Sequence, residues 1–260
     1  MEAAPQRVAS QGDITAEIAA LAVEAAEYQR LGRQEFQPRL DYPPYRSSVL
    51  RHPEFPPLTV DPDEIERWAP CFGHQDVAPG DADLTAGHPG EPIGERIIVT
   101  GRVLDEFGRP VTGQLVEIWQ ANASGRYHHQ LDQHPAPLDP NFIGAGRCLT
   151  GPDGSYRFLT IKPGPYPWRN HFNAWRPAHI HFSLFGTAFT QRLVTQMYFP
   201  GDPLFELDPI ASSIVDPVAR QRLVAEYDHD LTQPEYATGY RWNIVLSGGR
   251  RTWTEGADDG

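Results

Sequence analysis

The chain has 260 residues, of which 40% are hydrophobic and 22% are charged, and its formal net charge is −12 at pH 7. These values are typical of a globular protein of one large domain or two small ones, and the acidic balance argues against nucleic acid as a partner. The 26 prolines and 23 glycines favour a fold of short elements and shaped loops over a helical bundle.

The cysteine content and the N-terminus bear on the cellular compartment. Cys71 and Cys148 are the two cysteines, too few and too far apart for a disulfide framework. We expect both to be reduced, with Cys148 as a buried structural thiol. The first residues lack the basic and apolar regions of a signal peptide, and no apolar run approaches the ~20 residues that span a bilayer. The sequence therefore predicts a soluble, cytoplasmic protein that does not bind a membrane.

Residues 1–93 are predicted to form an N-terminal helix and a proline-rich arm outside the main domain. Residues 13–33 begin with a potential N-cap at Asp13, are rich in Ala, Leu and Glu, and end near Gly32. The following stretch, up to about residue 95, is rich in Pro, Gly and Asp but keeps aromatic and apolar side chains. A solvated linker does not need such side chains, so we expect this arm to wrap a partner.

Residues 94–260 are predicted to form an all-β domain. Apolar residues bounded by turn signals predict strands over 97–104, 114–120, 156–161, 179–184, 193–199 and 240–246. A further strand is expected to begin near Gly146, and one helical insertion is expected over 217–228. Many short strands separated by turns are typical of an antiparallel β-sandwich.

The predicted strand 179–184 carries two histidines on one face. Alternate residues of a strand point the same way, so His179 and His181 share a face while Ile180 points to the other. Just upstream, residues 166–176 concentrate aromatic and basic side chains. Two imidazoles at this spacing are half of a metal site.

Two kinds of side chain are candidates for the other half of that site. Asp132, Asp139 and Asp153 lie in predicted loops and offer carboxylates. Tyr127 follows a loop of small residues, and Tyr166 lies between two prolines that restrict its backbone. Because the pKa of a phenol is near ~10, ionising it at neutral pH needs a strong cation. A tyrosine pair would therefore select a hard trivalent ion such as Fe(III) over Zn(II).

The same segment resembles the iron-ligand region of the intradiol ring-cleavage dioxygenases. The resemblance is carried by Tyr-Pro-Trp-Arg-Asn at 166–170 and Trp-Arg-Pro-Ala-His-Ile-His-Phe at 175–182. It continues over the segments 94–98, 117–122, 125–127, 137–142, 146–150 and 198–203. The likeness thus covers residues 94–250, with a weaker match at Asp41–Tyr42. These motifs are highly specific.

This resemblance implies a prealbumin-like β-sandwich that binds one non-haem Fe(III) per chain. The implied ligands are Tyr127, Tyr166, His179 and His181, with Tyr166 also acting as a displaceable proton acceptor. Arg176 is implied to stabilise negative charge during the reaction, assisted by Gln196. The implied substrate-binding residues are Trp119, Trp168, Ile210 and Tyr42, the last of which contacts a substrate carboxylate. Since the ligand set is then complete, His128, His129 and His171 are expected to lie near the site without binding the metal.

The implied reaction is cleavage of protocatechuate (3,4-dihydroxybenzoate) by O₂ to 3-carboxy-cis,cis-muconate, as in the β-ketoadipate pathway of aromatic-compound catabolism. In the two-chain members of the family, an iron-bearing β chain assembles with an α chain that lacks the ligands. All four ligand positions are filled here, so we expect an iron-bearing chain with an α partner. The alternatives are a dioxygenase of catechol or hydroxyquinol, and a transthyretin-like binding module, which has no reason to keep the tyrosine pair.

Overall fold

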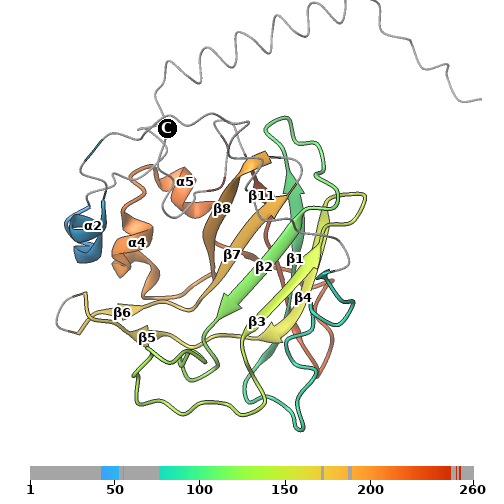
Figure 1. The fold of residues 1–260 in the computed structure, drawn as a ribbon, viewed down its shortest axis with the longest axis horizontal. Helices are drawn as coiled ribbons and strands as arrows, with labels where there is room; N and C mark the ends of the chain where they lie inside the picture. Colours follow the sequence, from blue (N-terminus) through green and yellow to red (C-terminus); the bar gives the residue numbers. More distant parts are fainter. Residues whose placement is uncertain are drawn as a thin grey trace, which may run out of the picture.

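The computed structural model describes residues 42–52, 55, 76–170, 173–186, 189–246, 250 and 252. In this part the protein is mostly β-sheet with a few short helices (Figure 1). The predicted helix over 13–33 and most of the proline-rich arm lie outside the described residues, as do Cys71 and His171. Over the same described ranges, no helix is long and apolar enough to cross a membrane.

The first sheet is built around β1 (Arg96–Leu104), a strand whose inner residues are almost all apolar and buried. β4 (Ser155–Ile161) runs antiparallel to β1, whereas β10 (Thr238–Arg241) and β11 (Ile244–Val245) run parallel to it. β9 (Glu226–Tyr227) then pairs antiparallel with β10. The expectation of purely antiparallel pairing is therefore wrong for β10 and β11, because both run parallel to β1.

The second sheet has the order β3–β2–β7–β8, and every pairing in it is antiparallel. Its strands are β2 (Leu115–Gln120), β3 (Ala145–Leu149), β7 (His179–Gly186) and β8 (Phe189–Tyr198). β7 and β8 extend further toward their connection than predicted. The reason is a register shift between Leu184 and Gly186, which interrupts the alternation on which the prediction depended. A two-stranded ribbon of β5 (Tyr166–Pro167) and β6 (Trp175–Arg176) lies beside this sheet (Figure 1).

The apolar faces of the two sheets share one core. The ring of Phe182 on β7 lies 5.7 Å from that of Tyr156 and 6.4 Å from that of Phe158, both on β4. Ile180 and Phe182 are fully buried in this core. Because side chains alternate along a strand, their neighbours His179 and His181 must lie on the opposite face of the second sheet.

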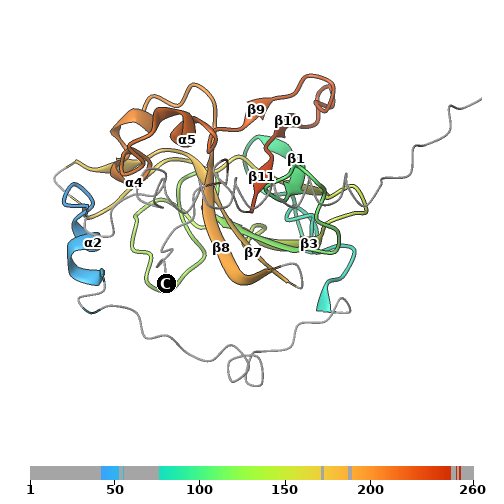
Figure 2. The same ribbon diagram turned by 90° about the horizontal axis from the view of Figure 1, so that it is seen from above.

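Short helices gather at one end of the two sheets. They are α2 (Arg46–Arg51), the 3₁₀ turn η3 (Phe205–Leu207), α4 (Pro209–Ser212) and α5 (Pro217–Gln221), and α4 and α5 lie next to each other in both views (Figures 1 and 2). The predicted helical insertion over 217–228 is too long, since α5 ends at Gln221 and β9 follows. α4 and α5 both begin with Asp-Pro, and the carboxylates of Asp208 and Asp216 accept hydrogen bonds from the first turns.

Residues upstream of position 94 already pack on the sheets. The backbone N–H of Leu84 donates to the carbonyl oxygen of Leu159 at 2.9 Å, and that of Leu159 donates to Ala82 at 3.0 Å. The side chain of Leu84 is buried. Part of the stretch that the sequence assigns to the arm is therefore hydrogen-bonded to β4.

Cys148 on β3 is half-buried and packs against the core, less enclosed than predicted. Burial raises the pKa of its thiol to about 12. At pH 8 only about one thiol in 10,000 is then ionised, and the thiolate is the reactive form. We expect iodoacetamide at pH 8 to leave Cys148 unmodified in the folded chain and to alkylate it in urea. A Cys71→Ser variant lets the labelled mass report Cys148 alone, and rapid labelling of that folded variant would contradict the expectation.

Candidate metal centre and active site

The four predicted metal ligands meet at the start of β7. The hydroxyl oxygens of Tyr127 and Tyr166 lie 3.5 Å and 3.4 Å from Nε2 of His179. The rings of His179 and His181 are 4.9 Å apart, and those of the two tyrosines are 5.3 Å apart. The fold thus brings together the side chains that the sequence placed in separate segments.

Both histidines of the cluster are held in the neutral form. His179 is buried, and its Nδ1 donates to the carbonyl oxygen of Pro177 at 2.7 Å, which directs the lone pair of Nε2 toward the tyrosines. Burial, then the charge of Arg176, then His181 hold the pKa of His179 well below its usual value. Burial and Arg176 lower the pKa of His181 to about 3. Neutral imidazole is the form that binds a metal ion.

Tyr127 is delivered by a loop organised around the buried Asn122. The side-chain oxygen of Asn122 accepts from the backbone N–H groups of Ser124 and Arg126, each at 3.0 Å. The carboxylate of Asp132 accepts from the backbone N–H of Tyr127 at 2.7 Å. Asp132, one of the carboxylates considered as a ligand, therefore supports the backbone of a tyrosine ligand candidate.

The other two carboxylates hold backbone N–H groups of their own turns, and Asp139 also accepts from the backbone N–H of Ile93 at 2.7 Å. Asp139 accepts from the backbone N–H of Asn141 at 2.8 Å, and Asp153 from that of Ser155 at 3.2 Å. Throughout the described part of the chain, no group of three or more His, Cys, Asp or Glu residues is arranged to hold a metal. The tyrosines are the described side chains that lie against His179 with a donor oxygen.

The loops that carry the two tyrosines pack backbone against backbone. A Cβ atom at Gly125 would lie 2.2 Å from the carbonyl oxygen of Pro165, and one at Gly164 would lie 2.4 Å from that of Ala123. The backbone N–H of Gly164 donates to the carbonyl oxygen of Asn122 at 2.9 Å. Only glycine permits this approach, which sets the separation of the tyrosine pair.

Arg176 and Gln196, the predicted reaction-assisting pair, are joined beside the cluster. Nη2 of the buried Arg176 donates to Oε1 of Gln196 at 2.6 Å, and Nη1 lies 3.3 Å from Nε2 of His179. Burial alone would lower the pKa of Arg176, but neighbouring groups led by Tyr198 and Asp208 raise it well above its usual value. The guanidinium therefore keeps its positive charge at the edge of the site.

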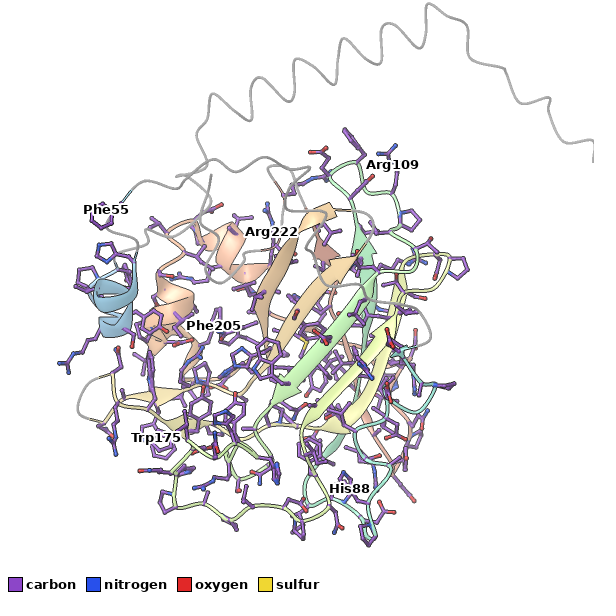
Figure 3. The ribbon with its side chains drawn as sticks, in the orientation of Figure 1. Phe55, His88, Arg109, Trp175, Phe205 and Arg222 are labelled. Carbon is purple, nitrogen blue, oxygen red and sulfur yellow. The ribbon has the colours of Figure 1, made fainter. Side chains whose placement is uncertain are left out.

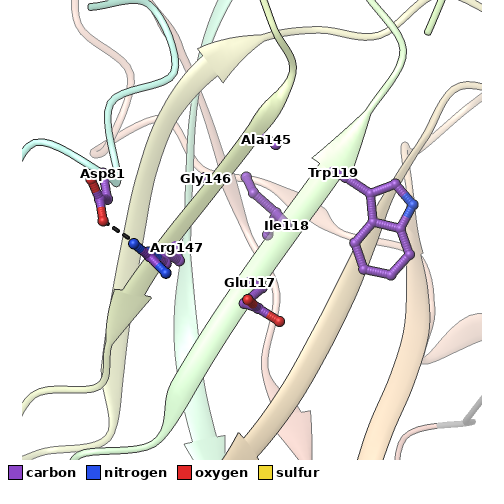
Figure 4. A pocket seen from close by; sticks show the side chains of 7 residues that line it. All are labelled: Asp81, Glu117, Ile118, Trp119, Ala145, Gly146 and Arg147. Atoms are coloured by element: carbon purple, nitrogen blue, oxygen red, sulfur yellow. Dashed lines mark hydrogen bonds and ion pairs between the residues drawn. The ribbon is translucent and has the colours of Figure 1, made fainter. Parts of the chain in front are cut away.

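Of the predicted pocket residues, Trp119 contacts a ligand candidate and Trp168 contacts Arg176. The indole of Trp119 stacks on the ring of His181 at 4.7 Å with an interplanar angle of 1°, and also lines an open pocket of about 390 Å³ over the paired strands β2 and β3 (Figure 4). The guanidinium carbon of Arg176 lies 5.6 Å from the ring of Trp168. Ile210 is buried on α4.

Tyr45 packs on Trp168, one of the predicted substrate-binding residues. The backbone N–H and carbonyl of Tyr42 both bond to the hydroxyl of Ser48. The ring of Tyr45 lies 5.4 Å from that of Trp168. Contact between Tyr42 and a substrate stays a prediction.

Asn170 ties the segment containing α2 to the β5–β6 ribbon. Its buried side chain accepts from the backbone N–H of Arg46 at 2.9 Å and donates to the carbonyl oxygen of Pro44 at 2.7 Å. Residues 44 and 46 flank Tyr45, so these two bonds hold the ring of Tyr45 against Trp168. Sequence reasoning missed both Asn170 and Tyr45.

Replacing Asn170 with alanine is expected to loosen this contact without disturbing the metal ligands. We expect KM to rise about three- to tenfold, at near wild-type kcat and iron content; this corresponds to about 0.7 to 1.4 kcal/mol, the size of one typical hydrogen bond. Steady-state oxygen uptake and iron analysis measure these quantities. Asn243→Ala is the matched control. The side-chain oxygen of Asn243 also accepts a hydrogen bond from a backbone N–H, that of Arg102 at 2.9 Å, but it does so at β1, away from the β5–β6 ribbon. An equal rise in KM in both variants would contradict the assignment.

The remaining histidines of the region lie to one side. His128 and His129 are exposed. The ring of His134 lies 6.3 Å from that of Trp175, which stands at the outer edge of the β5–β6 ribbon (Figure 3). His128, His129 and His134 therefore stand apart from the four-residue cluster, and His171 lies outside the described residues.

Comparison with known proteins identifies the family. A family model described as "Dioxygenase" matches residues 68–248, and one described as "Protocatechuate 3,4-dioxygenase beta subunit N terminal" matches residues 32–63. A protocatechuate 3,4-dioxygenase β chain of Burkholderia cepacia is 58% identical over 213 residues, covering 81% of this chain and 90% of that protein. The α chain of the Pseudomonas putida enzyme of that name is 30% identical over 157 residues, covering 60% of this chain and 73% of that protein.

A solved structure agrees at the level of the fold. The hydroxyquinol 1,2-dioxygenase of Pseudomonas putida DLL-E4 aligns with a TM-score of 0.51 at 22% identity, covering 92% of this chain and 84% of that one. The chain belongs to the intradiol ring-cleavage dioxygenases and, within them, to the protocatechuate 3,4-dioxygenase β chains.

Proposed function

We propose that this chain is the iron-bearing β subunit of an enzyme that cleaves protocatechuate with O₂ to 3-carboxy-cis,cis-muconate in the β-ketoadipate pathway of aromatic catabolism. The observation that carries the proposal is the convergence of Tyr127 and Tyr166 on His179, at 3.5 Å and 3.4 Å from its Nε2. That convergence occurs in a chain 58% identical to a protocatechuate 3,4-dioxygenase β chain. A pure binding module would have no use for it.

The donor set fits one Fe(III) per chain. Tyr127, Tyr166, His179 and His181 would hold it, as two phenolates and two neutral imidazoles. A hard trivalent cation suits such phenolates and offsets their charge in a largely buried site, whereas Zn(II) is more often held by His, Cys and carboxylate. When bound, Fe(III) supplies the Lewis acidity and the electron-accepting capacity that let a catecholate react with O₂.

The residues around the ligands would bind and orient the substrate. Tyr166 is half-buried, and its Oη, 3.4 Å from Nε2 of His179, would accept a proton from a catechol hydroxyl. Nη1 of Arg176, 3.3 Å from Nε2 of His179, would stabilise negative charge on the ring, with Gln196 fixing Nη2. Trp119, Trp168 and Ile210 would line the pocket, and Tyr42 would bind the carboxylate.

The visible spectrum of the iron-loaded chain tests the ligand set. Charge transfer from tyrosinate to Fe(III) should colour the protein burgundy, and a colourless preparation with full iron content would refute the assignment. Oxygen uptake then tests the substrate. We expect faster uptake with protocatechuate than with catechol or hydroxyquinol, and equal rates would remove the claim of carboxylate recognition.

An α chain is the proposed partner, in a hetero-oligomer of αβ protomers. The α-chain relative supports a two-chain enzyme, and the match at residues 32–63 places the β-type N-terminal region in this chain. Phe55, within that region, is 82% exposed beside α2 (Figure 3). Co-expression with the α chain tests the pairing, since stable co-purification is expected and separation of the two chains would argue against it.

Finer features of the fold are also part of the proposal. The two sheets would form a prealbumin-like sandwich over residues 94–260, and residues 1–93 would supply the N-terminal helix and the partner-wrapping arm. A soluble, cytoplasmic enzyme is expected from the reduced thiols inferred for Cys71 and Cys148. Limited proteolysis of the free chain and of the αβ complex tests the arm, which should be cleaved in the first and protected in the second.

A further inference from the structure

The buried carboxylate of Asp208, a residue outside the predicted site, forms two hydrogen bonds with the guanidinium of Arg176. Oδ1 of Asp208 accepts from Nε at 3.2 Å, and Oδ2 accepts from Nη2 at 2.8 Å. Both side chains are buried. This two-point pairing fixes the plane of a guanidinium, because each of two parallel N–H groups meets its own oxygen. It leaves Nη1 as the nitrogen that faces Nε2 of His179, at 3.3 Å.

Asp208 is itself held by its surroundings. The backbone N–H of Ile210 donates to Oδ1 at 3.3 Å, and the hydroxyl of Tyr198 donates to Oδ2 at 2.8 Å. The ring of Tyr198 packs 4.9 Å from that of Phe205, which lies under α4 (Figure 3). These contacts hold the carboxylate of Asp208 in one orientation, and the carboxylate in turn holds the guanidinium of Arg176.

We infer that Asp208 is a positioning residue for the reaction, which turns Nη1 of Arg176 toward the tyrosine–histidine cluster and keeps it there. The inference rests on the proposed function, since Arg176 stabilises charge only if that reaction takes place. The bond from Nη2 to Gln196 fixes one point of the guanidinium, whereas Asp208 meets both Nε and Nη2 and so fixes its plane.

Asp208 also caps α4, so its structural role must be separated from the positioning role. Asp216 offers the matched control. It is the N-cap of α5, is followed by proline in the same way, and accepts from the backbone N–H of Val218 at 2.9 Å. The backbone of Asp216 (φ −69°, ψ 114°) is nearly that of Asp208 (φ −74°, ψ 113°). Asparagine caps helices about as well as aspartate, so Asp208→Asn and Asp216→Asn both keep the cap, but the first loses the charge and one oxygen.

The test compares the full-length iron-loaded variants, each produced with its α partner. For Asp208→Asn we expect kcat to fall about 10- to 100-fold, as when a reacting group is misplaced by about 1 Å. KM and the dissociation constant of the non-reacting analogue 4-hydroxybenzoate, read from the visible spectrum, should stay within about threefold of wild type. Asp216→Asn should change none of these, and Asp208→Glu should recover part of kcat because it restores the charge.

Two outcomes would overturn the inference: a kcat of folded Asp208→Asn within twofold of wild type, or equal losses in Asp208→Asn and Asp216→Asn. If Asp208→Asn does not fold, Tyr198→Phe decides. It removes the hydroxyl that bonds to Oδ2 and that also accepts from Nη2 of Arg176 at 3.0 Å, while the carboxylate keeps its charge. A lower kcat at unchanged analogue affinity supports the inference that the Asp208–Tyr198 pair positions Arg176, and an unchanged kcat refutes it. Turnover of protocatechuate by the wild type tests the proposed function separately. The inference about Asp208 depends only on the ratio of variant to wild-type kcat, which can be measured with any catechol that the wild type cleaves.

Discussion

Replacing His179 with alanine is expected to abolish iron retention and, with it, the visible colour and the oxygen uptake of the chain. Nε2 of His179 is the atom on which both tyrosine hydroxyls converge, at 3.5 Å and 3.4 Å. Loss of a partner outside the ligand set already costs a metal site about 10- to 100-fold in affinity, so loss of a ligand should cost more. We expect less than about one tenth of the wild-type iron content after dialysis. Metal analysis and absorbance in the visible range measure it.

His128→Ala is the matched control for this variant. His128 follows Tyr127 directly in the chain but is exposed, so its replacement should leave iron content, spectrum and turnover unchanged. Unfolding of the metal-free proteins in urea checks that His179→Ala still folds. If folded His179→Ala retained iron and colour, the metal centre would have to lie elsewhere.

Strands such as β4 and the first half of β7 were predictable because their side chains alternate between the core and the other face of the sheet. Ile180 and Phe182 point into the core, and that alternation alone placed His179 and His181 together on the other face. The direction of β10 and β11 was not predictable in the same way. Each is short, with four and two residues, and so short a strand fits β1 in either direction until the path of the preceding loop is known.

The site was predictable where one segment carried its chemistry and unpredictable where the fold joined distant segments. Arg176 and His179 are three residues apart in the sequence, whereas Asp208, which bonds to Arg176, follows it by 32 residues. The Asp-Pro pair at 208–209 does predict a helix start, yet nothing local indicates that the capping carboxylate also turns toward a guanidinium. Tyr42 and Tyr45 are three residues apart, and only the two bonds from Asn170 settle which ring faces Trp168.

Gly125→Ala is expected to disrupt the metal centre although it replaces none of the proposed ligands. The added Cβ would lie 2.2 Å from the carbonyl oxygen of Pro165 and 3.2 Å from Cβ of Tyr166, so the segment carrying Tyr166 must move. Neither contact can be relieved cheaply, because the closer one is to backbone. We expect a weaker charge-transfer band, at least about tenfold weaker iron binding, and a loss of turnover of similar size, as for other changes that misplace a ligand. Titration of the metal-free chain with iron measures the affinity.

Gly108→Ala separates this clash from ordinary backbone strain. Gly125 and Gly108 both have φ of +79°, so alanine at either position carries the cost of a left-handed backbone, about 1–2 kcal/mol. A Cβ at Gly108, however, meets nothing within 4 Å. Both variants should therefore lose stability in urea, but only Gly125→Ala should also lose iron affinity. Equal iron affinity in the two variants would mean that the approach of the Gly125 loop to Pro165 does not set the separation of the tyrosine ligands. Selective loss in Gly125→Ala would show that this backbone contact maintains the geometry of the metal centre.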